Sequence, residues 1–114
     1  MSPSPFYIFS TLVSIPASTT NKVLLFENAT GKALRLLRVI FYSNTSINPQ
    51  IFFSIFRGAE KIIPSEGVLY PHTSKVHVDV SEELPSGSRL EIEYTNTTSN
   101  DVSLVVILEF EVLG

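Results

Sequence analysis

The fold of this chain is decided by VSLVVILEFEV, residues 102–112, and by two shorter runs before it, KVHVDV at 75–80 and RLEIEY at 89–94. Apolar residues take every second position in each run, which is the period of a β-strand with one face toward a core. The last run differs on its second face, where Val105 and Ile107 stand beside Ser103, Glu109 and Glu111. A strand that is partly apolar on both faces is typical of an assembly or of a covered sheet.

The rest of the chain consists of further strand-like runs separated by turn residues. Aromatic and β-branched residues predict strands at 6–13, 21–27, 32–43 and 50–57. Two shorter strands, 61–63 and 68–70, end at prolines and are expected at edges or corners. Eight or nine short strands without a convincing helix predict an all-β fold, an antiparallel β-sandwich or barrel.

Residues 32–43 could also be read as a helix, because their leucines satisfy helical spacing. The cluster Val39-Ile40-Phe41-Tyr42 favours a strand instead, and only Thr30 could cap a helix here. Strict alternation would place Leu34, Leu36 and Ile40 on one face and Val39 and Phe41 on the other. Because both faces are then largely apolar, we expect this strand to be central.

A length of 114 residues fits one domain. We expect residues 1–20 to form an extended N-terminal arm or edge strand and residues 21–114 to form the β-sandwich. The start of the chain is apolar but has no basic segment, so it is interpreted as a retained arm and not as a signal peptide. Residues 6–13 could lie along an edge of their own sheet or pair with a neighbouring subunit by strand addition.

The composition excludes several classes of function. Charged residues make up 17% of the chain and the formal net charge is −3. The eight Lys and Arg residues are scattered singly, so direct nucleic-acid binding is not expected. The absence of cysteine excludes disulfides and thiolate metal sites. No apolar run approaches the roughly 20 residues of a membrane span.

Two groups of polar residues could carry chemistry. His77 and Asp79 lie two apart on one exposed strand face, where a histidine and a carboxylate could orient a base or bind a metal. An alternating solvated face explains them more simply, and neither His72, the other histidine, nor any nucleophile is placed beside them by the sequence.

The second group contains only acids. Glu91 and Glu93 share a face, and Glu109 and Glu111 would join them if the last two strands formed a hairpin. Paired carboxylates can act as acid and base or hold a hard cation, but four acids on neighbouring strands are more often a solvated face. We expect no enzyme, no cofactor and no metal site.

Three Asn-x-Ser/Thr sequons begin at Asn28, Asn44 and Asn96, each in a segment with loop composition. They are candidate glycosylation sites if the protein faces the outside of a glycosylating host. Otherwise they are ordinary turns.

The corner Leu84-Pro85-Ser86-Gly87 leads into Leu90-Glu91-Ile92, and the loops are rich in Ser and Thr. With the strand count and the strands that are apolar on both faces, this pattern over residues 21–112 resembles the single jelly-roll modules of viral capsid, turret and decoration proteins. The resemblance implies a jelly-roll-like sandwich of about eight strands. It also implies a subunit role in a virion shell or its surface attachments.

Few charges and an apolar arm point independently to self-association. We therefore expect a structural protein of a virion that contacts further copies of itself or other shell proteins. The candidate assembly contacts are Phe6, Tyr7, Ile8, Phe9, Leu12, Val105 and Ile107. The alternative is a lectin-like module, extracellular or on a cell surface, that binds a glycan or receptor through loops such as 44–49 and 96–101.

Overall fold

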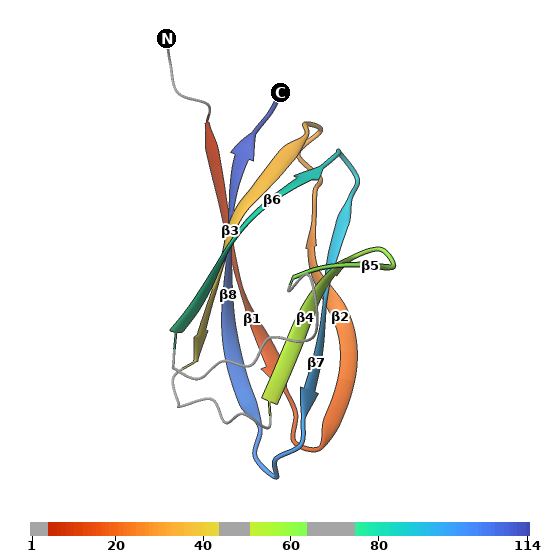
Figure 1. Ribbon diagram of the computed structural model, residues 1–114, viewed down its shortest axis with the longest axis vertical. Helices are drawn as coiled ribbons and strands as arrows, with labels where there is room; N and C mark the ends of the chain where they lie inside the picture. Colours follow the sequence, from red (N-terminus) through yellow and green to blue (C-terminus); the bar gives the residue numbers. More distant parts are fainter. Residues whose placement is uncertain (1–4, 44–50, 64–74) are drawn as a thin grey trace.

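A computed structural model describes residues 5–43, 51–63 and 75–114 and contains eight β-strands (Figure 1). The expected strand at 68–70 lies outside the described residues, as do His72, Asn44 and the 44–49 loop. The strands are β1 (Phe6–Ile15), β2 (Thr19–Glu27), β3 (Leu34–Ser43), β4 (Ile51–Arg57), β5 (Glu60–Ile63), β6 (Lys75–Leu84), β7 (Arg89–Asn96) and β8 (Val102–Val112).

The strands form two four-stranded antiparallel sheets that face each other (Figure 1). One has the order β1-β8-β3-β6 and is called here the β8 sheet. The other has the order β2-β7-β4-β5 and is called the β7 sheet. Apart from the β4–β5 hairpin, each connection between described strands carries the chain from one sheet to the other. This is the double-sheet arrangement of a jelly roll, and it confirms the expected all-β sandwich.

Among the described residues, no helix is long and apolar enough to cross a membrane. The run at 6–13 becomes the edge strand β1, which pairs with β8 of the same chain. The strand expected at 21–27 begins two residues earlier, at Thr19. The strand expected at 32–43 occupies an interior position between β8 and β6, as predicted.

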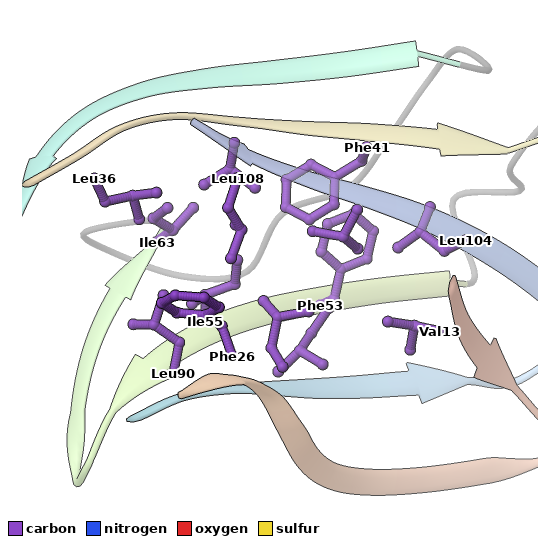
Figure 2. Close-up of a cluster of buried hydrophobic side chains, with 14 of the residues drawn as sticks. Val13, Phe26, Leu36, Phe41, Phe53, Ile55, Ile63, Leu90, Leu104 and Leu108 are labelled. Atoms are coloured by element: carbon purple, nitrogen blue, oxygen red, sulfur yellow. The ribbon is translucent and has the colours of Figure 1, made fainter. Parts of the chain in front are cut away.

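Side chains from both sheets fill the space between them, as Figure 2 shows. The expected inward face of β8 is confirmed, because Leu104, Val106, Leu108 and Phe110 are fully buried. Aromatic rings join the two layers: the Phe26 and Phe110 centroids lie 4.8 Å apart, and those of Phe41 and Phe53 lie 4.5 Å apart. The described side chains of one copy therefore form a continuous buried core.

A β-bulge in β3 overturns the strict alternation predicted for this strand. Leu34 and Leu36 are buried, but so are Val39 and Phe41, which alternation would place on the opposite face. The register of β3 against β8 shifts between Leu36 and Arg38, and the extra residue returns the later apolar side chains to the core. The strand looked apolar on both faces because its phase changes in the middle.

Candidate functional site

The outward face of the β8 sheet carries a group of apolar side chains. Its members are Phe6, Ile8 and Leu12 of β1, Ile40 and Tyr42 of β3, and Val105 and Ile107 of β8, and this set is called the outer apolar patch. The register places Val105 between Leu12 and Tyr42 and Ile107 between Ser10 and Ile40, whereas Ile8 and Phe6 lie beside Glu109 and Glu111. Phe6, Ile8 and Leu12 are 65%, 65% and 61% exposed, so an apolar partner could still bury most of their surface.

Charged residues lie beside Phe6 and Ile8 at one end of the same face. Arg38 pairs with Asp79 at 3.0 Å and approaches Glu109 at 3.9 Å, while Arg35 pairs with Glu111 at 3.3 Å. These side chains are partly or largely exposed, and such pairs contribute about 0–1 kcal/mol each to stability. Their main effect is to border the patch with fixed charges of both signs.

The outward face of the β7 sheet is different in character. Thr20 and Thr95 face each other across β2 and β7 with their hydroxyls 3.2 Å apart. Lys22 places its Nζ 4.1 Å from the centre of the Phe56 ring, which covers that ring with a cation. Leu24, which is 55% exposed, is the single large hydrophobic side chain that is exposed on the described part of this sheet.

The structure separates the residues expected to make assembly contacts into two groups. Phe6, Ile8, Leu12, Val105 and Ile107 belong to the outer apolar patch. Tyr7 and Phe9 alternate with them along β1 and lie on its other face, where their ring centroids are 6.1 and 5.0 Å from that of Phe26. Phe9 packs against the core of its own chain, whereas Tyr7 contacts the Phe26 ring and stays 37% exposed.

The four acids, which a hairpin of the last two strands would have brought together, do not form a cluster, because these strands do not pair with each other. β7 and β8 belong to different sheets, so Glu91 and Glu93 lie on the opposite side of the sandwich from Glu109 and Glu111. The connection between Asn96 and Val102 crosses from one sheet to the other instead of making a hairpin. In the described parts of the chain, no group of three or more His, Cys, Asp or Glu side chains is arranged to hold a metal ion.

His77 and Asp79 share the exposed face of β6, as expected. The Asp79 carboxylate accepts a hydrogen bond from Arg38 Nε at 3.0 Å. His77 lies opposite Ile40 in the register with β3. Asp79 therefore belongs to the charged border of the patch.

Asn28 and Asn96, two of the three sequon asparagines, are buried at 0% and 1% exposure. The Asn28 Nδ2 donates to the carbonyl oxygens of Lys32 and Leu84 at 2.8 and 3.0 Å. The Asn96 Nδ2 donates to those of Asn100 and Ile15 at 2.8 and 3.3 Å. A glycan would be attached at this same nitrogen, so the folded arrangement favours a structural role for both amides.

The threonine of each sequon completes the same loop. The Thr30 hydroxyl donates to Asn28 Oδ1 at 2.7 Å, and the Thr98 hydroxyl donates to Asn96 Oδ1 at 2.6 Å. In both loops the backbone N–H two residues after the threonine donates to the threonine hydroxyl, at 3.2 and 3.3 Å. The Asn-x-Thr sequence is thus a turn motif that the chain uses twice.

The two asparagines join the sheets at opposite ends of the sandwich. Asn28 follows β2 and reaches Leu84 at the end of β6, whereas Asn96 ends β7 and reaches Ile15 at the end of β1. Leu84 is paired with Leu34, six residues after Asn28, and Ile15 is paired with Val102, six residues after Asn96. We call these contacts the two amide clamps. The sequence signal for them is a shared pattern in NATGKALRL at 28–36 and NTTSNDVSL at 96–104: both begin with Asn-x-Thr and end with a leucine.

No protein-family model matches this chain, and no curated protein sequence does either. Several solved structures share its fold. A chain in the capsid of Helicobacter pylori bacteriophage KHP30 is 12% identical, with a TM-score of 0.63 over 96% of this chain and 94% of that one. The Yersinia pseudotuberculosis-derived mitogen is 14% identical, with a TM-score of 0.55 over 94% and 86% of the two chains.

A third likeness is to a chain from a structure that shows the triple jelly-roll fold and turret assembly in an archaeal virus. It is 12% identical with a TM-score of 0.52, and the match covers 95% of this chain but 29% of that protein. At these identities the likeness is one of fold. It confirms the resemblance to viral jelly-roll proteins at the level of architecture.

Proposed function

We propose that this protein is a self-associating structural subunit of a virion, in its capsid, turrets or surface decoration. The outer apolar patch is the observation that carries the proposal. The core is filled by side chains of one copy, so Phe6, Ile8 and Leu12 add little to that core while remaining exposed. Contiguous apolar surface of this kind marks contact sites on other proteins.

The surroundings of the patch support a protein partner. Interfaces combine an apolar centre with a polar rim, and the pairs Arg38–Asp79 and Arg35–Glu111 provide such a rim along one side. The β7 sheet, with its threonines and acids, would then face solvent. A subunit with one apolar contact face and one solvent-exposed polar face suits a protein layer that has an inside and an outside.

The partner is expected to be another shell protein or another copy, not nucleic acid. Four of the positive side chains, those of Arg35, Arg38, Arg57 and Arg89, are each within 4.0 Å of a carboxylate oxygen. Their charge is thus compensated locally, and no basic field for phosphate groups arises from them. The fold shared with a phage capsid chain over nearly the whole of both chains adds support.

Light scattering on the purified protein over a concentration series tests the proposal. We expect the wild-type mass to rise above that of a monomer, and the variant Leu12→Lys to lower the association at least tenfold. Leu24→Lys is the matched control, because Leu24 is 55% exposed against 61% for Leu12 but lies on the β7 sheet. A wild-type protein that stays monomeric and does not bind to a shell of its partner proteins would refute the proposal. Binding of that monomer to immobilised glycans would support the lectin-like alternative instead.

A further inference from the structure

We propose that two copies of this chain join through their β1 strands, antiparallel and centred on Ser10, so that two four-stranded sheets become one eight-stranded sheet. The inference rests on the self-association proposed above and specifies the contact that produces it. The partner is a second copy of the same chain.

β1 lacks every device that normally protects the edge of a sheet. Charges, prolines, bulges and short length keep edge strands from pairing with other chains. β1 has ten residues, FYIFSTLVSI, with no charge and no proline, and its register with β8 runs without a shift.

The other three edges are protected. β2 contains Lys22 and Glu27 and a register shift after Leu24. β5 has only four residues and includes Glu60 and Lys61. β6 contains His77, Asp79, Glu82 and Glu83 and is also irregular in its pairing. The described structure therefore leaves one edge open to strand pairing, and it is β1.

The backbone direction of β1 shows which groups are open. Val112 donates its N–H to the carbonyl of Pro5 at 2.8 Å, so Pro5 and Val112 form a hydrogen-bonded pair. Such pairs alternate along an antiparallel ladder. The even-numbered residues of β1 therefore direct their N–H and C=O groups away from β8: Phe6, Ile8, Ser10, Leu12 and Ser14. They are the same residues whose side chains are exposed on the outward face.

The strand complements itself when a second copy is placed antiparallel to it about Ser10. Ser10 then lies opposite Ser10 of the other copy, Ile8 opposite Leu12, and Phe6 opposite Ser14. Every open N–H and C=O finds a partner, no like charges meet, and isoleucine packs beside leucine on the outward face. The contact is isologous, as a two-fold dimer requires. The twofold axis is perpendicular to the sheet, so the two outer apolar patches join on one side.

Single cysteines test this register directly, because the chain has none of its own. Hydrogen-bonded antiparallel residues have Cα atoms about 5.5 Å apart, which is within the range of a disulfide. Ser10→Cys should therefore form a disulfide dimer on mild oxidation. Ser14→Cys is the matched control on the same exposed face, since its own counterpart would be eight residues away, roughly 26 Å. We expect at least a tenfold excess of dimer for Ser10→Cys.

Ser10→Pro provides a second test that does not depend on oxidation. Proline is tolerated on edge strands where the lost N–H points away from the ladder, so the variant should keep its β circular dichroism spectrum and lose dimerisation. If the wild type associates but Ser10→Cys and Ser14→Cys cross-link equally, or Ser10→Pro associates as before, the β1 contact is wrong and the proposed function survives. If the folded wild type stays monomeric, the β1 contact is wrong; if it also does not bind to a shell of its partner proteins, the proposed function fails as well.

Discussion

Replacing Asn28 by aspartate tests how much one amide clamp contributes to the fold. The change alters almost no volume and keeps the oxygen that accepts from Thr30. It removes the amide that donates to Lys32 and Leu84 at 2.8 and 3.0 Å and places a carboxyl oxygen against those carbonyls. Two lost hydrogen bonds of about 1 kcal/mol each, and a buried carbonyl left without its donor at about 1–3 kcal/mol, give a loss of about 3–5 kcal/mol at pH 7.

The loss should depend on pH in a defined direction. A carboxyl at position 28 is fully buried and faces carbonyl oxygens, so its pKa in the folded state is raised above the unfolded value of about 3.9. The protonated form can still donate one hydrogen bond. The deficit relative to wild type is therefore smallest below about pH 4 and grows as the pH rises through the folded-state pKa.

Urea unfolding of the wild type and the variant at pH 7 and near pH 4 measures both effects. Asn21→Asp is the matched control, because Asn21 is exposed on β2 and its side chain only accepts from the Lys22 N–H at 2.8 Å. Its unfolding free energy should stay within about 0.5 kcal/mol of wild type. Equal losses for the two variants, or a deficit at position 28 that does not change with pH, would refute the clamp.

Three further substitutions test other parts of the structure by the same unfolding assay. Phe53→Ala should lower the free energy of unfolding by about 3–5 kcal/mol, because the ring is 1% exposed and its removal leaves a cavity. Phe6→Ala, at a residue that is 65% exposed, should leave the stability of the monomer nearly unchanged. A similar loss for both variants would contradict the assigned core. Gly58→Ala should lower the free energy of unfolding by roughly 1–2 kcal/mol, because Gly58 has a φ of 63° in the β4–β5 turn. An added Cβ would meet no other atom, so the loss would come from the backbone conformation alone. An unchanged urea midpoint would argue against this turn. Thr98→Val should lower the free energy of unfolding by about 1–2 kcal/mol, because it removes the 2.6 Å hydrogen bond from the Thr98 hydroxyl to Asn96 Oδ1. Thr20→Val should lower it less, because it removes only the exposed 3.2 Å contact between the Thr20 and Thr95 hydroxyls. The reverse order would rule out the shared turn motif.

The sequence was sufficient to predict most of the strands and the inward face of β8. Alternation over residues 102–112 has a single phase, and nothing in that strand interrupts it. In β3 the pattern was misleading, because the bulge between Leu36 and Arg38 changes the phase and makes one buried face look like two apolar ones. Local sequence does not show which residue of a strand is left out of the ladder.

The candidate site was only partly predictable for a related reason. Phe6, Ile8 and Leu12 share one parity along β1, so an alternating strand places them together. Tyr7 and Phe9 have the opposite parity, so the same alternation places them on the other face of β1, toward Phe26. The grouping of the four acids depended on a hairpin between the last two strands, but a six-residue step can be a hairpin or a crossing, and here it crosses between the sheets.

The two amide clamps also determine how the protein responds to its chemical surroundings. Small β domains are often secured by disulfides, which open in a reducing cytosol and close outside the cell. Here carboxamides tie the layers at both ends in a chain with no thiol, so the tie is unaffected by redox potential. The same fold can thus form in a reducing compartment and persist in an oxidising one, without an oxidation step in between.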